Sequence, residues 1–170
     1  SMNISIWRRI CDRLLTIPPK PIIESPRNSK QKISITYDHK DKFNGIFQYL
    51  NRQCEGNAHL KKIVEITSSG DRLNECYEII TKNWNNRWFT KSGHFNWWMV
   101  DFKEMRVSVT AYSLKTYIAG DNNYPHLKSW VIEGSIDKEH WTRIDKQEPN
   151  NYLKGAGYSK IIELNQPTTP

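Results

Sequence analysis

The change of hydrophobic period along the chain constrains its fold most. Apolar residues recur at helical spacing only in two short segments before residue 53, and from residue 63 they alternate or form short runs. Alternation with a period of two is typical of a strand with one buried face. Short strands joined by polar loops, with little helix between them, indicate a β-sandwich or jelly roll. We therefore predict an all-β domain.

The expected strands follow the apolar alternation. They are 33–37, 63–67, 97–102, 107–116, 130–134, 141–144 and 158–164. The turn 136–139 should join two of them, 130–134 and 141–144, as a hairpin. The long strand 107–116 should change its buried face near Thr110. A short amphipathic helix is expected at 42–52, where Phe43, Ile46, Phe47 and Leu50 share one face.

The segment before this domain has a different pattern. In residues 1–17, Ile6, Ile10 and Leu14 are spaced as on one face of a helix, with basic residues opposite. We expect a short helix that packs on the domain or belongs to a preceding one. A basic helix on a membrane surface is the alternative. Residues 18–32 hold four of the eight prolines and form the expected linker, and the domain proper should span 33–170.

The charge distribution bears on the class of partner. The net charge is +7, but residues 1–42 hold nine Lys and Arg against four Asp and Glu, so the remainder is close to balanced. A nucleic-acid-binding domain concentrates its basic residues on the domain itself. No run of 18 apolar residues occurs that could span a membrane. We expect neither a nucleic acid partner nor a membrane span.

The cysteines number three, Cys11, Cys54 and Cys76, and their spacing is irregular. Secreted small domains more often pair their cysteines. We expect reduced thiols in a cytoplasmic protein, with a Cys54–Cys76 bridge as the alternative. His59 could join Cys54 and Cys76 as a zinc ligand, but no paired Cys-x-x-Cys spacing is present. The intervening Gly-Asn favours a turn over a metal site or a Cys/His nucleophile.

Two loops carry the candidate binding residues. Residues 82–90 place two Trp and an Arg among three Asn, and such groups suit stacking on a sugar or gripping a peptide. In the alternative interpretation Trp88 is in the core and the Asn residues shape turns. Residues 119–126 form a turn-rich loop that should expose its aromatic and imidazole groups. The candidate ligand-binding residues are Trp84, Arg87, Tyr124 and His126.

Several motifs together resemble a known family. They are Phe43-Asn44-Gly45-Ile46, Cys54-x-Gly-Asn-x-His59, Thr67-Ser68-Ser69, Trp97-x-x-x-Asp101-Phe102, Thr110-x-Tyr112-Ser113-Leu114 and the run His126–Ser135 followed by Asp137 and Trp141. Over residues 43–164 the chain resembles the coagulation factor 5/8 type C, or discoidin-like, domains. The resemblance is to their intracellular protist branch, which is often linked to BTB domains. It implies a galactose-binding-like jelly roll that recognises a glycan, a lipid head group or a protein through loops at one end.

The chain departs from that family in two ways. The family often binds a structural calcium, but residues 83–90 contain no carboxylate here, and hard cations prefer carboxylate ligands. We therefore expect no metal and no cofactor. The family pattern also continues with two further strands after Asn165, whereas this chain stops at Pro170. The last of those strands would pair beside 63–67.

The missing strand leaves three possibilities for that edge, because unpaired strand edges invite pairing. They are that the domain lacks the strand outright, that a second copy covers the edge, and that residues 32–37 fill it. We favour filling and place self-association slightly ahead of the internal strand.

Three functions compete. The first is a non-catalytic module that binds a protein or carbohydrate, and the second is an adaptor or oligomerisation domain without a small ligand. The third is a hydrolase that uses Cys54 and His59. No phosphate-binding glycine loop and no Gly-x-Ser-x-Gly elbow occurs in the chain. We expect the binding module and no enzyme activity.

Overall fold

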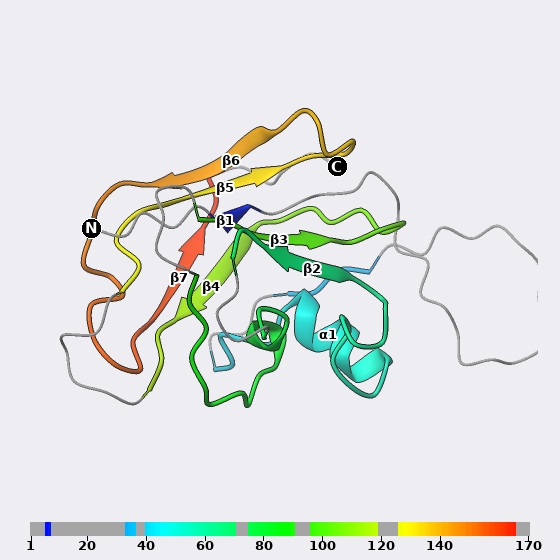
Figure 1. Ribbon diagram of the computed structural model, residues 1–170, viewed down its shortest axis with the longest axis horizontal. Helices are drawn as coiled ribbons and strands as arrows, with labels where there is room; N and C mark the ends of the chain where they lie inside the picture. The colour runs from blue at the N-terminus through cyan, green and yellow to red at the C-terminus, as the bar shows by residue number, and fades with distance from the viewer. Residues whose placement is uncertain are drawn as a thin grey trace, which may run out of the picture.

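The computed structural model describes residues 6–7, 33–36, 40–70, 75–90, 96–118 and 126–165. The described part is mainly strands in small sheets with one α-helix, as the period of two predicts (Figure 1). The elements are β1 (Ile6–Trp7), α1 (Ile46–Gln53), β2 (Glu65–Ser68), the 3-10 helix η1 (Glu78–Ile80), β3 (Trp98–Asp101), β4 (Ala111–Lys115), β5 (Trp130–Gly134), β6 (Thr142–Gln147) and β7 (Ser159–Glu163). None of the helices described could cross a membrane, since each is too short and too polar.

The strands form three groups. β5 lies between β1, to which it is parallel, and β6, to which it is antiparallel. β2 pairs with β3, and β4 pairs with β7, both antiparallel. A bulge interrupts the β5–β6 ladder, where Ile132 faces Asp145 and Glu133 faces Arg143. Ile144 is the extra residue of this bulge, and it packs against both hydrophobic clusters of the protein.

Most of the expected elements are present with shorter bounds. The hairpin of β5 and β6 is confirmed, and α1 begins a few residues later than predicted. The expected strand 107–116 is a strand only over β4, although the buried Val107 and Val109 precede it. The predicted change of face is also present. Val109 belongs to one hydrophobic cluster, whereas Tyr112 packs against the other.

Two expectations about the leading segment are corrected. Ile6 and Trp7 form a strand where a helix was expected, and the rest of 1–17 lies outside the described residues, as does the linker 18–31 with Lys32. A short helix is marginal on its own, while isoleucine and tryptophan favour strands and find an open edge at β5. Residues 33–36 form no strand, although Ile33 packs against the core.

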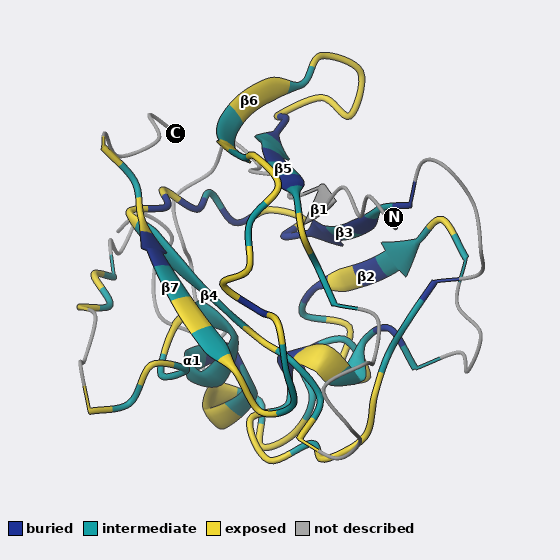
Figure 2. Cartoon of the chain, turned by 90° about the vertical axis from the view of Figure 1, so that its left-hand side faces the viewer, coloured by how far each residue is buried: buried dark blue, intermediate teal, exposed yellow. Residues whose placement is uncertain are grey.

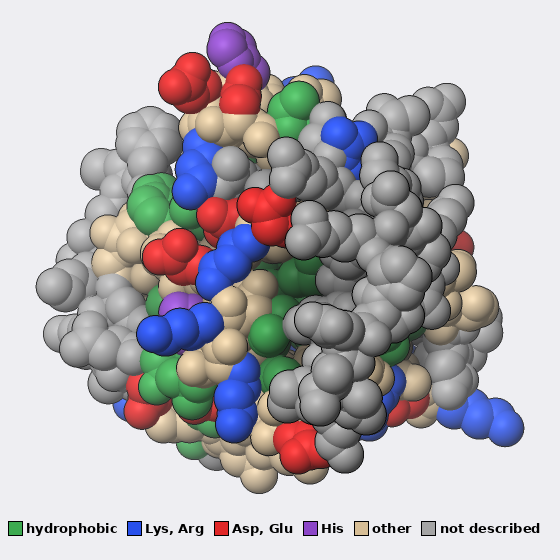
Figure 3. Space-filling view, turned by 90° about the vertical axis from the view of Figure 1, so that its right-hand side faces the viewer, with side chains coloured by type: hydrophobic (Ala, Val, Ile, Leu, Met, Phe, Trp, Pro, Cys, Tyr) green, Lys and Arg blue, Asp and Glu red, His purple; other side chains and the backbone are tan. Residues whose placement is uncertain are grey.

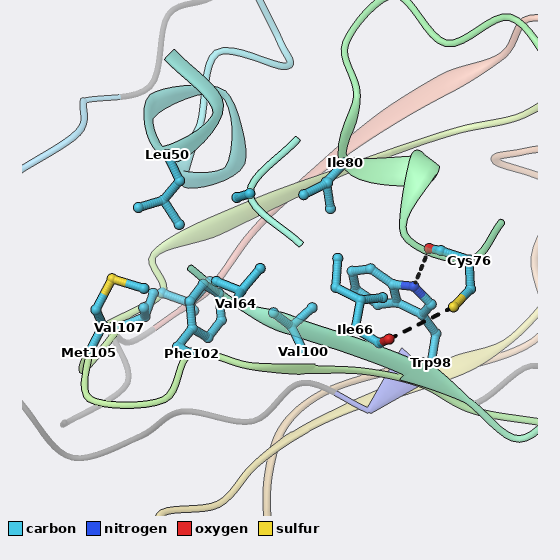
Figure 4. Packing of buried hydrophobic residues seen from close by; sticks show 12 residues of the cluster. Leu50, Val64, Ile66, Cys76, Ile80, Trp98, Val100, Phe102, Met105 and Val107 are labelled. Carbon is cyan, nitrogen blue, oxygen red and sulfur yellow. Dashed lines mark hydrogen bonds between the residues drawn. The ribbon is translucent and has the colours of Figure 1, made fainter. Parts of the chain in front are cut away.

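The larger hydrophobic cluster joins α1 to β2 and β3 (Figure 4). Phe47 of α1 stacks on Phe102 with ring centroids 5.9 Å apart and meets Trp98 edge-on at 6.2 Å. The indole Nε1 of Trp98 donates to the carbonyl oxygen of Cys76 at 2.9 Å, so its one polar atom is satisfied inside the core. The buried members are Leu50, Ala58, Val64, Ile66, Cys76, Ile80, Trp98, Val100, Phe102, Met105, Val107 and Val109.

The smaller cluster packs β5 against the β4–β7 pair. Its buried members are Trp130, Ile132, Leu153 and Ile162. Figure 2 shows β4 and β7 on one side of the molecule, β2 and β3 on the other, and β5 between them. Two consecutive hydrogen bonds cross this contact. Trp130 Nε1 donates to the hydroxyl of Tyr112 at 2.7 Å, and that hydroxyl donates to the Asp145 carboxylate. Burial and the Asp145 carboxylate raise the pKa of Tyr112, so the hydroxyl keeps its proton.

Candidate functional site

The first predicted loop follows η1 and is anchored in the core. The backbone N–H of Trp84 donates to the carbonyl oxygen of Thr81 at 3.1 Å, and the Trp84 side chain is half-buried. Trp88 packs against the larger cluster, as the core interpretation of this stretch requires. The Trp88 Nε1 is buried and has no hydrogen-bond partner among the described residues. Trp88 is therefore mainly a packing residue.

The same loop presents a cation at the surface. Arg87 is exposed, and its guanidinium carbon lies 5.6 Å from the ring centroid of Phe89. The side-chain oxygen of Asn86 accepts the N–H of Arg87 at 2.9 Å, so an asparagine shapes this turn as the alternative interpretation proposed. Of the candidate residues in this loop, Arg87 is the exposed one, whereas Trp84 is half-buried.

The structure describes only the last residue of the second predicted loop, His126. Tyr124 lies outside the described residues, while His126 is half-buried on the stretch that leads into β5. The His126 Nε2 is buried and has no hydrogen-bond partner within the described parts of the chain. That the loops of Arg87 and Tyr124 share one face stays a prediction.

An exposed apolar patch that the sequence reasoning missed lies where β4 ends and β7 begins. Ile118, Tyr152 and Tyr158 are 56%, 47% and 52% exposed. Soluble proteins tolerate single exposed apolar residues, but a group of them more often marks a binding site. Ile118 immediately precedes the loop that carries Tyr124, so this patch continues one of the predicted binding loops. We call Ile118, Tyr152, Tyr158 and the neighbouring Lys160 the tyrosine patch.

Hydrogen bonds hold the backbone beneath the tyrosine patch. The hydroxyl of Thr116 donates to the carbonyl oxygen of Gly155 at 2.6 Å and accepts the N–H of Tyr158 at 3.0 Å. The N–H of Thr116 donates to the carbonyl oxygen of Tyr158 at 2.8 Å, and the N–H of Gly157 donates to Tyr117 at 2.8 Å. One threonine thereby fixes the turn that presents Tyr158.

The residues of the patch are connected through Lys160 and through the turn that precedes β7. The ammonium of Lys160 lies 4.7 Å from the ring centroid of Tyr152, a cation–π contact. Tyr158 immediately precedes β7 and is two residues away from Lys160 in that strand. A Cβ on Gly157 would lie 3.9 Å from the Cγ2 atom of Ile118, which places that side chain beside the same turn.

Two glycines make the turn possible and are the signal that could have revealed it. Gly155 has φ of +135° and Gly157 has φ of +72°, both in the region that favours glycine. A Cβ on Gly155 would lie 2.6 Å from the Tyr158 ring, so the ring rests directly on the glycine backbone. Leu153, 2% exposed, anchors the loop in the smaller cluster. A Gly-x-Gly turn between two tyrosines in polar sequence is the pattern to recognise.

The Cys54–His59 motif stabilises the outer edge of β2. His59 Nδ1 accepts the N–H of Ile66 at 3.0 Å, and the buried thiol of Cys76 lies 4.0 Å from the carbonyl oxygen of Ile66. The ring of His59 stacks on Tyr77 with centroids 5.0 Å apart. Both polar backbone groups of Ile66 face away from β3, and these two side chains satisfy them. The expectation that a strand fills this edge is therefore wrong for residues 33–36, which form no strand.

The cysteine thiols have structural surroundings. Cys54 follows α1, and its sulfur lies 3.4 Å from the carbonyl oxygen of Gly56. Cys54 and Cys76 are both free, as expected, and Cys11 lies outside the described residues. Within the described ranges no three His, Cys, Asp or Glu side chains gather in a way that could hold a metal ion.

The turn between β5 and β6 is a second ordered polar element. Asp137 accepts the N–H groups of Glu139 and His140, each at 2.8 Å, and its other oxygen lies 2.7 Å from His140 Nδ1. These donors lower the pKa of Asp137. Lys138 reaches from the same turn to Asp101 of β3 at 3.1 Å. Figure 3 shows acidic and basic side chains interspersed on one face of the molecule.

Comparison with known proteins adds no assignment. No protein-family model matches the chain, and neither the curated proteins nor the solved structures give a significant match. Function therefore has to be argued from the residues of the chain and their geometry.

Proposed function

We propose that the chain is a non-catalytic binding module of discoidin type, with a galactose-binding-like jelly-roll fold. It recognises a carbohydrate or a protein through loops at one end of the sandwich. The observation that carries this proposal is the tyrosine patch, where two half-exposed tyrosines and an isoleucine surround an ordered turn. The packing of β5 against the β4–β7 pair through a shared hydrophobic cluster supports the fold.

The chemistry of the patch favours a ligand with an apolar face and polar edges. A tyrosine ring offers a flat apolar surface and a hydroxyl that can donate and accept. Lys160 adds a cation beside Tyr152 that can donate to a hydroxyl or carbonyl oxygen. A sugar ring has this combination of C–H face and hydroxyl edge, and so does a peptide segment with an aromatic residue. Because Thr116 holds the turn, the ligand meets a preorganised surface.

The proposal includes the absence of catalysis. It is supported by the contacts of the Cys54 and His59 side chains, which are made with backbone groups. A Cys/His nucleophile pair needs the imidazole to contact the thiol. Here His59 Nδ1 accepts the N–H of Ile66, and the Cys54 thiol lies against backbone carbonyls. We also propose a cytoplasmic location, supported by the free thiols of Cys54 and Cys76.

A glycan array probed with the fluorescently labelled full-length chain tests the proposal. We expect binding to a restricted set of glycans, which Tyr158→Ala abolishes or weakens at least tenfold. Ile136→Ala is the control, because Ile136 is 57% exposed in the turn between β5 and β6, outside the tyrosine patch. Binding that Tyr158→Ala leaves unchanged would contradict the proposed site. If the chain binds no glycan on the array but recovers a protein from the native cell, this result would indicate the adaptor function.

A further inference from the structure

β1 lies between two strand pairs and contacts both. Its residues run parallel to β5, with Ile6 opposite Ile132 and Trp7 opposite Glu133. β5 pairs with β6 on its other edge, and β3, which β1 also contacts, pairs with β2 on its other edge. Figure 1 shows β1 in this position, between β5 and β3. The N-terminal strand is therefore the element that closes the gap between the two pairs.

Leaving the β5 edge that β1 covers unpaired would destabilise the protein. β5 is among the most buried strands, with Trp130 and Ile132 2% and 3% exposed. An uncovered edge of such a strand presents unpaired N–H and C=O groups, which recruit another strand. Within the described residues, β1 pairs with Ile132 and Glu133 of β5, which shows that this edge accepts a strand.

The connection from β1 back to the domain is long. Residues 8–32 separate Trp7 from Ile33, the next residue that the structure describes. About 25 residues reach up to ~80 Å when fully extended, far more than the span needed within one domain. Four prolines lie in this connection, Pro18, Pro19, Pro21 and Pro26. A connection of this length can deliver the same strand to a neighbouring molecule.

We propose that the β5 edge facing β3 is a strand-docking site that exchanges β1 between two copies of this chain. The sequence known to fit the site is the chain's own N-terminal strand, so a second copy supplies an identical occupant with the same register. Exchange of both strands gives a closed, two-fold dimer in which each β5 pairs with the partner's β1. This inference does not depend on the tyrosine patch or on its ligand.

The concentration at which exchange occurs follows from the connection. A strand joined to its own docking site through a connection acts at an effective concentration, which is on the order of millimolar for connections of modest length. At about 20 μM protein, the β5 edge is therefore occupied by the strand of the same molecule, while strands from neighbouring molecules compete for it near 1 mM. The account predicts a monomer in dilute solution and a dimer that grows with concentration.

Disulfide trapping in the full-length chain tests the proposal. Trp7→Cys and Glu133→Cys place thiols at directly paired positions, in a background with Cys11→Ser and Cys54→Ser. Mild oxidation should give mainly intrachain disulfide at about 20 μM and a substantial interchain fraction near 1 mM. Mixing two differently tagged preparations should give mixed dimers. Ile6→Cys with Ile132→Cys repeats the test at the second pair, in case the first variant folds poorly.

The controls separate exchange from random collision. Ile6→Cys with Gln53→Cys, an exposed position on α1, should cross-link far less at the same concentration. Intrachain disulfide alone at every concentration would overturn the exchange. The absence of disulfide at both pairs, with the protein folded by circular dichroism, would overturn the docking site itself. Glycan binding by the same preparations reports on the tyrosine patch separately, so the two proposals can fail independently.

Discussion

The backbone N–H of Ile66 donates to Nδ1 of His59 at 3.0 Å, and this bond takes the place of a strand at the outer edge of β2. The Cys76 thiol lies against the carbonyl oxygen of the same residue at the same edge, so both polar groups of Ile66 are engaged. Ile66 is 3% exposed, and water does not replace these partners readily. Side chains close this edge, which makes it a poor site for pairing with another chain.

His59→Ala should therefore destabilise the protein. The substitution leaves the buried N–H of Ile66 without its acceptor, which costs about 1–3 kcal/mol, and it also removes the stacking on Tyr77. Urea unfolding followed by tryptophan fluorescence measures the change. Leu60→Ala, an exposed neighbour of His59 that is 58% accessible, serves as the control and should change the stability little. Equal stability of the His59 variant and the control would show that the edge is held in some other way.

The alternation of apolar residues was sufficient to predict the central strands. β5 and β3 are short, mainly apolar runs in which alternate residues are buried, and the polar turn before Trp141 indicates the hairpin. The helical spacing of Ile46, Phe47 and Leu50 likewise predicted α1, because a local period determines which face is buried. These features depend on neighbours in sequence, so the sequence carries them directly.

Features that depend on distant partners were not predictable in the same way. Ile6 and Trp7 fit a helical period, but the edge of β5, more than a hundred residues away, gives them a strand partner. The role of His59 depends on Ile66, across a turn whose path the sequence pattern does not specify. The tyrosine patch was missed because Tyr152 and Tyr158 stand in polar sequence, and the pairing of β4 with β7 brings the turn before Tyr158 beside Ile118.

Tyr112→Phe should weaken the contact between the two sheets. The hydroxyl of Tyr112 accepts from Trp130 Nε1 and donates to Asp145, so its loss leaves both groups short of one partner. We expect a loss of about 1–3 kcal/mol in the free energy of unfolding, measured by urea denaturation. Tyr158→Phe, which removes a hydroxyl from an exposed ring, is the control and should be nearly neutral. A neutral Tyr112→Phe would mean that water or a neighbour replaces the hydroxyl.

The Asp137 turn predicts a dependence of stability on acid pH. The N–H of His140, its imidazole and the N–H of Glu139 lower the pKa of Asp137 from its ordinary value of 3.8. Because the pKa is lower in the folded chain, this carboxylate contributes its full stabilisation above that ordinary value. The contribution is then lost as the pH falls through the lowered pKa. Asp137→Asn removes the dependence.

Unfolding titrations of both proteins across pH measure this contribution as a difference. The wild type should exceed Asp137→Asn in stability near neutral pH, and the difference should shrink below about pH 4. A difference that stays constant down to about pH 2 would contradict the assigned cause of the shift.

Gly155→Ala should disturb the tyrosine patch from beneath. The added Cβ would lie 2.6 Å from the ring of Tyr158, and the φ of +135° disfavours any side chain. We expect a stability loss of about 1–3 kcal/mol and a displaced Tyr158 ring. Gly45→Ala is the matched control, since a Cβ there meets nothing within 4 Å. If the account is right, glycan affinity falls in Gly155→Ala and not in Gly45→Ala.

The claim that the tyrosine patch binds the ligand is tested most directly by nuclear magnetic resonance of the tyrosine rings. The chain has eight tyrosines, which can be labelled selectively and assigned by substitution to phenylalanine. The strongest glycan from the array is titrated into the full-length protein. The account predicts that the ring signals of Tyr152 and Tyr158 shift most, while that of Tyr112, between the two sheets, stays in place. A saturable shift confined to other tyrosines, with Tyr152 and Tyr158 unchanged, would contradict it.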